Sequence, residues 1–471
     1  MKNIFIETYG CQMNEYDTQL VKAILTKANY TFVPNEDESD IILLNTCAIR
    51  ENAHNKVYGR VHSILHTRHK SQDTSHKTQN AIIKRPVLIG ILGCMATNLR
   101  KELFENKNLK IDFIAGPDSY KRLPELISQA SETGEKTFDL TLSEFETYSD
   151  VYPTREKGVN AWIAVMRGCN NFCTFCVVPY TRGRERSRSP ENVVEEVKKL
   201  AQEGFRQVTL LGQNVNSYYY PFSKKMDNSN PRSLFFPEGE KERGADFADL
   251  LETVSRVEAI ERIRFTSPHP KDFPEKLLRT IASNPKICKH IHLPLQAGNN
   301  RILNLMDRTY TQEEFLKLVE KIRKLIPRVT LSTDIIVGFS SETDEEFENT
   351  IKVIHEVQFD SAFIFKYSER KNTIASKKYP DDVPDEKKTE RIVKLNEIQK
   401  EISLKKNRAH IGQTLDVLIE EKETPKSKNQ FQGRSDGNKI VVFPSGPYQR
   451  GETIPVKIID AATNCLKGII S

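Results

Sequence analysis

The sequence has no apolar run of about 20 residues, the length that a membrane-spanning helix requires. Its first ten residues, MKNIFIETYG, also lack the apolar core and the small-residue cleavage site of a secretory signal peptide. Cysteine is scarce, since eight cysteines in 471 residues are far below the density of a secreted disulfide scaffold. These absences predict a cytoplasmic protein whose cysteines bind metal rather than form disulfides.

Charge of one sign does not dominate either, because the formal net charge is only +6. Basic residues nevertheless cluster in residues 56–85, 182–188 and 366–378. Such clusters are compatible with a polyanionic partner, although for any one of them a solvated surface is an equally good interpretation. With 38% hydrophobic residues over 471 positions, the chain can bury several cores, and we expect two to four domains.

The middle of the chain repeats one pattern six times: an apolar, β-branched run, a turn, and then a helical pattern with an N-cap residue and an acidic first turn. The strand-like runs are residues 161–166, 207–212, 262–267, 289–295, 329–339 and 361–368. Six such units predict a parallel sheet that curls into an open (β/α)6 partial barrel over residues 155–385. The functional side of such a barrel lies at the C-terminal ends of its strands.

The two ends of the chain have a different character. Residues 1–140 alternate apolar runs with helical stretches, which predicts a separate α/β domain with parallel strands, joined by a linker at residues 137–157. Residues 408–471 read as short strands with a DGN turn at Asp436, which predicts a small β-barrel. A long charged helix precedes that barrel, and the polar residues 218–243 are expected to be a surface insertion.

Three cysteines, Cys169, Cys173 and Cys176, have the spacing C-x-x-x-C-x-x-C just after the first strand of the six-unit array. A structural zinc site needs four protein ligands, and no fourth Cys or well-spaced His lies nearby. A [4Fe-4S] cluster held by three thiolates has one iron without a protein ligand, which can chelate a small molecule. The spacing and the position therefore favour a cluster with an open iron over zinc.

A second set of cysteines is spread widely along the sequence. Cys11, Cys47 and Cys94 each follow a predicted strand of the N-terminal domain. Because the C-terminal ends of parallel strands face one crevice, these three thiols can converge on a second cluster with an open iron. Three unrelated buried cysteines are the alternative interpretation. Cys288 and Cys465 lie in or beside apolar runs and are expected to be structural.

The C-x-x-x-C-x-aromatic-C motif on a six-unit barrel resembles the radical S-adenosylmethionine superfamily. Two three-cysteine sites followed by a β-barrel of the TRAM type resemble the methylthiotransferases within it. YGCQMNEYD at Tyr9 and CTFCVVPYTRGRERSR at Cys173 are most similar to the MiaB family of tRNA methylthiotransferases. Sister enzymes that act on threonylcarbamoyladenosine in tRNA read GCKVN at the first site, and those that modify a ribosomal protein aspartate read GCPKN.

This resemblance implies an activity and a set of cofactors. A methylthio group would be added to carbon 2 of isopentenyladenosine next to the anticodon in tRNA, with two [4Fe-4S] clusters and S-adenosylmethionine as cofactors. One S-adenosylmethionine would donate the methyl group and a second would supply a 5′-deoxyadenosyl radical. The implied partners are the anticodon stem-loop, an electron donor and a sulfur source, and we expect a monomer with no membrane contact. A non-catalytic RNA-binding protein with structural metal sites is the alternative from another class.

By the same resemblance, several side chains would reach the bound S-adenosylmethionine, although barrel packing is an alternative role for most of them. They are Phe175, Gln213, Ser267, Gln296, Phe365 and Tyr367. Four arginines alternate with other residues after the motif, so an extended segment would show them on one face, suited to phosphates or to a carboxylate. They are Arg182, Arg184, Arg186 and Arg188; pairing with Glu185 or capping of the next helix is the alternative. In the terminal barrel, Arg434 and Lys439 are expected to add contacts to RNA.

Two loops depart from the family pattern. The family usually reads GFPGET where residues 338–343 are GFSSET, and YSPRPGT where residues 367–373 are YSERKNT. Loss of Pro and Gly changes the rigidity of the two loops but removes no candidate cluster ligand. The departures therefore bear only on the conformations of these loops.

Overall fold

The computed structural model describes residues 2–48, 56–66, 87–106, 109–222, 244–423 and 429–471. It divides the chain into two compact units. Unit 1 comprises residues 1–156, 167–186 and 370–377, and unit 2 comprises residues 157–166, 187–369 and 378–471. The motif cysteines, which follow the first barrel strand in sequence, therefore belong to the same unit as the N-terminal residues. This grouping was not predicted from the sequence, in which each domain was expected to be one continuous segment.

Unit 1 is built on a six-stranded, all-parallel sheet with the order β2-β1-β3-β4-β5-β6. Its strands are β1 Asn3–Tyr9, β2 Thr31–Phe32, β3 Ile41–Thr46, β4 Leu88–Gly93, β5 Phe113–Ala115 and β6 Thr137–Asp139. Its helices include α1 Gln12–Lys27, α3 Cys94–Asn98, α4 Arg100–Glu105, α5 Leu123–Thr133 and α6 Val178–Arg182. All six residues of β3 are buried, as expected for a central strand with both faces covered. The predicted parallel α/β domain is confirmed.

Residues 137–156 of the expected linker belong instead to unit 1. β6 occupies the start of that stretch, and Tyr148 is fully buried, with its hydroxyl donating a hydrogen bond of 3.0 Å to the Pro117 carbonyl. The sequence of this stretch, rich in Thr, Ser, Glu and Asp, is typical of a solvent-exposed linker. The buried Tyr148 and strand β6 instead attach it to the sheet.

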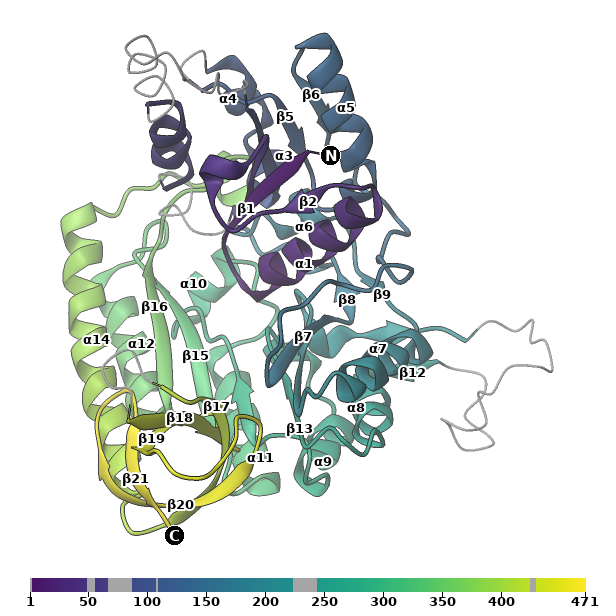
Figure 1. The fold of residues 1–471 in the computed structure, drawn as a ribbon. Helices are drawn as coiled ribbons and strands as arrows, with labels where there is room; N and C mark the ends of the chain where they lie inside the picture. Colours follow the sequence, from purple (N-terminus) through teal and green to yellow (C-terminus); the bar gives the residue numbers. More distant parts are fainter. Residues whose placement is uncertain (1, 49–55, 67–86, 107–108, 223–243, 424–428) are drawn as a thin grey trace. The chain divides into compact units, whose positions relative to one another are not determined.

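Unit 2 contains the expected open barrel of six parallel strands (Figure 1). They are β7 Asn160–Ala164, β10 Gln207–Leu211, β13 Arg262–Phe265, β14 His290–His292, β15 Thr330–Val337 and β16 Ser361–Lys366. Two three-stranded sheets, β13-β10-β7 and β14-β15-β16, are linked by a parallel bridge between Ile263 and Ile287. The covering helices are α7 Pro190–Gln202, α8 Phe247–Ser255, α9 Glu275–Ser283, α10 Asn300–Leu305, α11 Gln312–Leu325 and α12 Asp344–Val357. Capping boxes at Asp246, Thr311 and Thr343 start three of these helices, as the sequence predicts.

A long helix and a closed barrel complete unit 2. Helix α14, Asp385–Arg408, lies beside β16, and Ile335 and Val337 of β15 share an apolar cluster with Leu395 and Ile402 of that helix (Figure 1). The closed barrel has the order β17-β18-β19-β21-β20, drawn in yellow and yellow-green in Figure 1. Its strands are β17 Thr414–Glu421, β18 Gln430–Ser435, β19 Ile440–Pro444, β20 Thr453–Ala461 and β21 Leu466–Ile470. The predicted small β-barrel is confirmed, with β18 and β21 added to the three strands that the sequence indicates.

The remaining elements are short. They are β8 Met166–Arg167, β9 Arg186–Ser187, β11 Tyr219–Tyr220, β12 Ala245–Asp246, α13 Ile374–Lys378, and the 3-10 turns η1 Glu36–Glu38, η2 Tyr120–Arg122, η3 Val215–Ser217 and η5 Pro270–Asp272. Most of the predicted insertion, residues 223–243, lies outside the described residues, as do residues 67–85 of the first basic cluster. Within the described part of the chain, no helix combines the length and apolarity needed to cross a bilayer.

The two loops that depart from the family pattern keep left-handed backbone. Ser341 has φ 59° and Asn372 has φ 69°, and each stands where the resembling sequences carry Gly. Asn tolerates this region better than most residues, whereas Ser pays a steric penalty of about 1–2 kcal/mol. The left-handed backbone at Ser341 therefore carries strain that a glycine there would avoid.

We therefore expect Ser341→Gly to stabilise unit 2 by about 0.5–1 kcal/mol, because it relieves the strain and loses only a hydrogen bond from Arg301 to an exposed hydroxyl. In scanning calorimetry the midpoint should rise by about 1–3 °C. Asn372→Gly is the matched control and should change the midpoint less. A lower midpoint for Ser341→Gly would contradict the account of strain.

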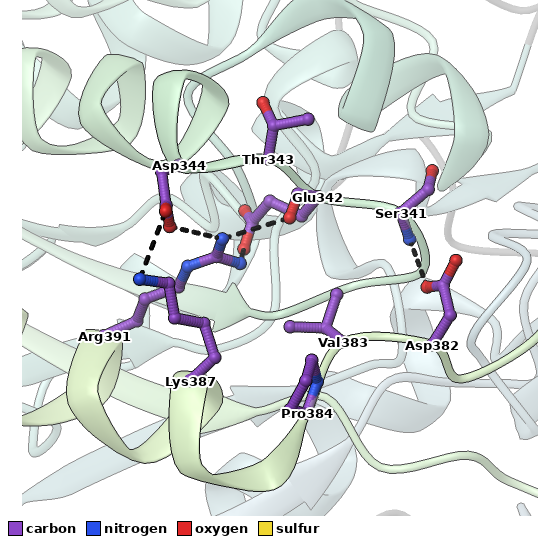
Figure 2. Close-up of a pocket in the computed structure, with 9 residues that line it drawn as sticks. All are labelled: Ser341, Glu342, Thr343, Asp344, Asp382, Val383, Pro384, Lys387 and Arg391. Carbon is purple, nitrogen blue, oxygen red and sulfur yellow. Dashed lines mark hydrogen bonds and ion pairs between the residues drawn. The ribbon is translucent and has the colours of Figure 1, made fainter.

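A pocket of about 290 Å³ lies between this loop and the start of α14 (Figure 2). Arg391 crosses it, donating to the Glu342 carboxylate at 2.8 Å and to Asp344 at 2.9 Å. Glu342 also accepts the Gly338 backbone N–H at 2.6 Å. Burial raises the pKa of Glu342 from 4.5 to about 7, although Arg391 and the Gly338 N–H oppose that shift. Glu342 thus joins the loop after β15 to α14 through a group that titrates near neutral pH.

The sign of the pH dependence follows from this shift. Between about pH 4.5 and pH 7 the folded state holds a proton that the unfolded state has released, so stability falls as pH rises through that window. We expect the melting temperature of the wild type to fall across this range more steeply than that of Glu342→Gln. Glu345→Gln, which alters an exposed carboxylate in the first turn of α12, should leave the wild-type slope unchanged. Equal slopes for all three proteins would contradict the assignment.

Candidate cluster-binding sites

Cys11, Cys47 and Cys94 come together at one edge of the sheet in unit 1. They follow β1, β3 and β4, which are neighbours in the sheet. The strand ends are in register, because Tyr9 is paired with Thr46, and Thr46 with Gly93. Cys47 and Cys94 are the residues directly after that aligned row, and Cys11 is the N-cap residue of α1. The three cysteines therefore follow neighbouring strands whose carboxyl ends are in register.

Two asparagines fix the loops that carry these cysteines. The Asn14 side chain donates to the Thr46 carbonyl at 3.1 Å, and the Asn45 side chain donates to the Asn14 carbonyl at 2.9 Å. Asn14 also accepts a hydrogen bond of 3.3 Å from the Cys11 thiol. A Cβ at Gly10 would lie 2.5 Å from Asn14 Oδ1, so only glycine allows this close approach. The asparagines, both fully buried, were not predicted from the sequence.

The electrostatics of this set favour a thiolate at Cys11. A hydrogen bond with Cys47 lowers the pKa of Cys11 to about 6, and the positive charge of Arg182 adds to that effect against the opposing effect of burial. Burial raises the pKa of Cys94, while the Arg182 guanidinium acts in the opposite direction. The Arg182 Nε–H donates to Cys94 Sγ at 3.1 Å. Because thiolates are the form of cysteine that binds metal, a cationic donor beside this set suits a cluster site.

The motif cysteines lie on a tight loop of the same unit. The Cys169 N–H donates to the Gly183 carbonyl at 3.1 Å, and the Cys176 N–H donates to the Cys173 carbonyl at 2.9 Å. Gly168 has φ 76°, and a Cβ there would lie 2.0 Å from the Arg184 carbonyl oxygen, so this position also requires glycine. The loop is thereby closed on itself, with Cys169 and Cys173 buried and Cys176 half-buried.

The donor chemistry at both sets fits iron–sulfur clusters. All eight cysteines are thiols rather than halves of disulfides, and six of them belong to unit 1. Within the described ranges, no three His, Cys, Asp or Glu side chains are grouped as ligands of a single metal ion. The Asn171 N–H donates to Cys169 Sγ at 3.4 Å, a backbone-to-sulfur hydrogen bond of the kind that tunes cluster ligands.

The prediction of an arginine-lined face after the motif is wrong for three of its four members. Arg182 and Arg186 of unit 1 and Arg188 of unit 2 are buried, with exposed fractions of 3%, 7% and 2%. The segment is not extended throughout, because Arg182 is the last residue of α6 and Gly183 has φ 72°, and only Arg186–Ser187 form a strand, β9. The guanidinium groups of the three arginines pair with buried carboxylates. Their partners are Asp17 and Asp118 in unit 1 and Glu196 in unit 2.

Arg184 is the exception. Its side chain is exposed and its guanidinium carbon lies 4.4 Å from the centre of the Phe172 ring. A cation held over an aromatic ring at the surface can still meet a phosphate or an unstacked base.

Asp17 is a buried residue that sequence reasoning missed. Its carboxylate accepts from Arg167 at 2.9 Å, from Arg182 at 2.7 Å and from the Tyr120 hydroxyl at 3.2 Å. The available signal was an acidic residue in α1 flanked by apolar residues that share its buried face.

The side chains expected to contact S-adenosylmethionine are divided between the units. Phe175 is half-buried in unit 1, and the others lie in unit 2, within or directly after strands of the barrel. Gln213, after β10, has a buried Oε1 atom with no hydrogen-bond partner among the described residues. Ser267 and Gln296, after β13 and β14, both have left-handed backbone, with φ 60° and 67°. Strained backbone of this kind is common at ligand sites, so these three positions are compatible with the predicted role.

Phe365 and Tyr367 lie differently. Phe365 of β16 is 38% exposed, on the face of the strand opposite to Ile364, which packs towards α14. Tyr367 is buried against Phe339, with ring centres 4.7 Å apart, and the Lys388 amine donates to its carbonyl. Of the two, the exposed phenyl ring of Phe365 is the more accessible to a ligand.

The inner face of β14 and β15 carries a polar group that the sequence did not indicate. Ser332 lies 3.0 Å from a His290 ring nitrogen and 2.9 Å from a His292 ring nitrogen. The other His292 nitrogen lies 3.1 Å from the Asp334 carboxylate. Burial lowers the pKa of His290 to about 3, so that ring is neutral. Strand alternation alone could have placed these residues on one face, but not identified their pairing.

The two residues of the terminal barrel that were predicted to contact RNA, Arg434 and Lys439, have different surroundings. The Arg434 guanidinium is half-buried and donates to Glu420 at 3.1 Å and to Asn438 at 3.2 Å. Lys439 forms an ion pair of 2.8 Å with Asp360 of the partial barrel, and its side chain is only 11% exposed. The prediction that Lys439 presents its amine to RNA is therefore wrong, because the amine joins two parts of unit 2.

Comparisons with known proteins agree with this architecture. Three family models match: the Radical SAM superfamily at residues 163–354, the Uncharacterized protein family UPF0004 at residues 3–116, and the TRAM domain at residues 408–470. Among solved structures, the radical S-adenosylmethionine methyltransferase TsrM from Kitasatospora setae has the same fold over 80% of this chain and 74% of its own. The TM-score is 0.53 and the identity 13%.

Curated relatives are much closer in sequence. The tRNA-2-methylthio-N(6)-dimethylallyladenosine synthase of Phocaeicola vulgatus is 43% identical, over 99% of this chain and 95% of its own length. The enzymes of the same name from Chloroherpeton thalassium and Porphyromonas gingivalis are 42% and 43% identical over 99% of this chain, and the chain covers 95% and 94% of them. The chain thus belongs to the tRNA-2-methylthio-N(6)-dimethylallyladenosine synthase family, within the radical S-adenosylmethionine superfamily.

Proposed function

We propose that this chain adds a methylthio group to carbon 2 of isopentenyladenosine next to the anticodon in tRNA. The observation that carries the proposal is the alignment of Cys11, Cys47 and Cys94 at three adjacent strand ends, in addition to the motif cysteines. One three-cysteine set is sufficient for radical chemistry. A second set gives sulfur transfer its own site, and this distinguishes the proposal from a radical enzyme of another kind.

We assign the work to three regions. Residues 1–140 would hold the auxiliary [4Fe-4S] cluster on Cys11, Cys47 and Cys94, and residues 155–385 would form the radical core, whose cluster is held by Cys169, Cys173 and Cys176. Residues 408–471 would bind RNA. When bound, the clusters and S-adenosylmethionine supply a radical that breaks an aromatic C–H bond, and a sulfur and a methyl group that replace the hydrogen. Carbon 2 of adenine is neither acidic nor electrophilic enough for a route by acid-base catalysis.

The protein side chains would bind and orient these partners. The unpartnered Gln213 amide oxygen, the strained Ser267 and Gln296 positions and the exposed Phe365 ring support a role in holding S-adenosylmethionine. Phe175 and Tyr367 belong to the same proposal, with weaker support from their surroundings. Arg184 and Arg434 are the cations that we assign to tRNA. The remaining partners are an electron donor and a sulfur source, and we place the protein in the cytoplasm as a monomer.

Nucleoside analysis of tRNA tests the substrate assignment directly. We expect cells that lack this chain to lose methylthio-isopentenyladenosine and accumulate isopentenyladenosine, and the wild-type gene to restore the product. Methylthio-threonylcarbamoyladenosine should be unchanged, which excludes the sister tRNA substrate. Unchanged methylthio-isopentenyladenosine would refute the assignment, and an unmodified ribosomal protein aspartate would favour the other sister enzyme.

A further inference from the structure

Three buried guanidinium groups of unit 1 share two buried carboxylates. Arg167, Arg182 and Arg186 have exposed fractions of 0%, 3% and 7%. The carboxylates that they contact are those of Asp17 and Asp118, whose side chains are fully buried. Three guanidinium groups against two carboxylates leave one positive charge to be balanced. A buried charge without compensation is costly, so its partner is informative.

Of the three arginines, Arg182 contacts a sulfur atom, Cys94 Sγ. Arg182 uses one terminal nitrogen for Asp17, at 2.7 Å, and its Nε–H for Cys94 Sγ, at 3.1 Å. Its other terminal nitrogen, Nη1, is buried with no hydrogen-bond partner among the residues that the structure describes. A buried donor of this kind is available to an acceptor such as a cluster sulfide. The buried group is neutral only when a thiolate or a negatively charged cluster lies beside Arg182.

The same residues connect the two cysteine sets within unit 1. Asp17 accepts from Arg182 on one oxygen and from Arg167 on the other. Arg167 directly precedes Gly168 and Cys169 in the sequence. A chain of buried, charge-assisted hydrogen bonds therefore runs from the Cys94 ligand to the start of the motif loop.

We propose that Arg182 is a positioning residue that donates a hydrogen bond to the Cys94 ligand and raises the reduction potential of the auxiliary cluster. The inference rests on the proposed function, because it requires a cluster on Cys11, Cys47 and Cys94. A cationic donor at a sulfur ligand stabilises the reduced state, which carries one more negative charge, more than the oxidised state. Loss of the donor therefore lowers the potential.

The test is a redox titration of the cluster-loaded, full-length protein, followed by electron paramagnetic resonance. The signal of the auxiliary cluster is identified as the one that disappears in Cys47→Ala. We expect Arg182→Gln to lower the midpoint potential of that signal. Arg182→Lys, which retains the charge but not the planar fork, should give a smaller shift in the same direction and keeps the test informative if Arg182→Gln is insoluble. Arg184→Gln, an exposed change two residues away, should leave the potential unchanged.

The two proposals fail in different ways. A wild-type protein that binds only one cluster contradicts the proposed function. If the wild-type protein binds two clusters, and Arg182→Gln and Arg182→Lys both keep the wild-type midpoint potential of the auxiliary cluster, the role of Arg182 is overturned. The proposed function is then unaffected. Loss of the auxiliary signal alone in Arg182→Gln, with the motif cluster retained, supports the positioning role.

Discussion

Cys169→Ala is expected to abolish the formation of 5′-deoxyadenosine from S-adenosylmethionine. Cys169 is buried at the start of a loop closed by its own backbone hydrogen bonds, so no other described thiol of that loop can take its place. With two thiolates left, the motif site loses its cluster, and the iron content should fall from about eight to about four per chain. Anaerobic iron analysis and chromatography of the nucleoside product measure both effects.

Cys465→Ala is the matched control. It makes the same chemical change at a half-buried cysteine in the turn between β20 and β21, far along the chain from either set. It should retain about eight irons and wild-type cleavage. If Cys169→Ala cleaved S-adenosylmethionine at the wild-type rate, the motif cysteines would not be needed for the reaction.

Cys47→Ala is expected to separate the two halves of the reaction. Cys47 directly follows the aligned row of strand ends and contacts Cys11, so its loss should remove the auxiliary cluster and leave about four irons. The motif loop keeps its three cysteines, and reduced protein should still form 5′-deoxyadenosine. The methylthio product should disappear, because the site that we assign to sulfur is gone.

Cys288→Ala controls for the loss of a buried thiol as such. Cys288 is 2% exposed in unit 2, outside both sets. It should cost stability through the cavity that it leaves, while the ratio of methylthio product to 5′-deoxyadenosine stays at the wild-type value. A Cys47→Ala protein that still makes the methylthio product would show that the N-terminal cysteines are not the sulfur site.

The fold follows from sequence periodicity wherever strands are apolar and helices are capped. The six barrel strands, the parallel N-terminal sheet and the terminal barrel are all readable in this way. β18 and β21 were missed because QFQGRS has few apolar residues and LKGII is short, so their pairing comes from barrel closure rather than from local propensity. β6 was missed for a similar reason, since its stability depends on pairing with β5.

The candidate site shows the same division between local and distant information. Cysteines at the ends of parallel strands could be predicted to converge, because strand polarity alone brings them to one edge. The arginines could not be placed correctly, because their partners lie far away in sequence. Arg182 and Asp17 are separated by 165 residues, and no local pattern reveals that pairing. An alternating run of arginines therefore resembled a phosphate-binding face, whereas Arg182, Arg186 and Arg188 each pair with a buried carboxylate.

The most direct test of the central claim is one anaerobic reaction of reduced, cluster-loaded protein with S-adenosylmethionine, an added sulfur source and an anticodon stem-loop that carries isopentenyladenosine. Mass spectrometry of the nucleosides should show one hydrogen replaced by one methylthio group at carbon 2, with formation of 5′-deoxyadenosine and S-adenosylhomocysteine. 5′-Deoxyadenosine without any methylthio product, from protein that holds both clusters and a sulfur source, would contradict the claim that this chain transfers sulfur to tRNA.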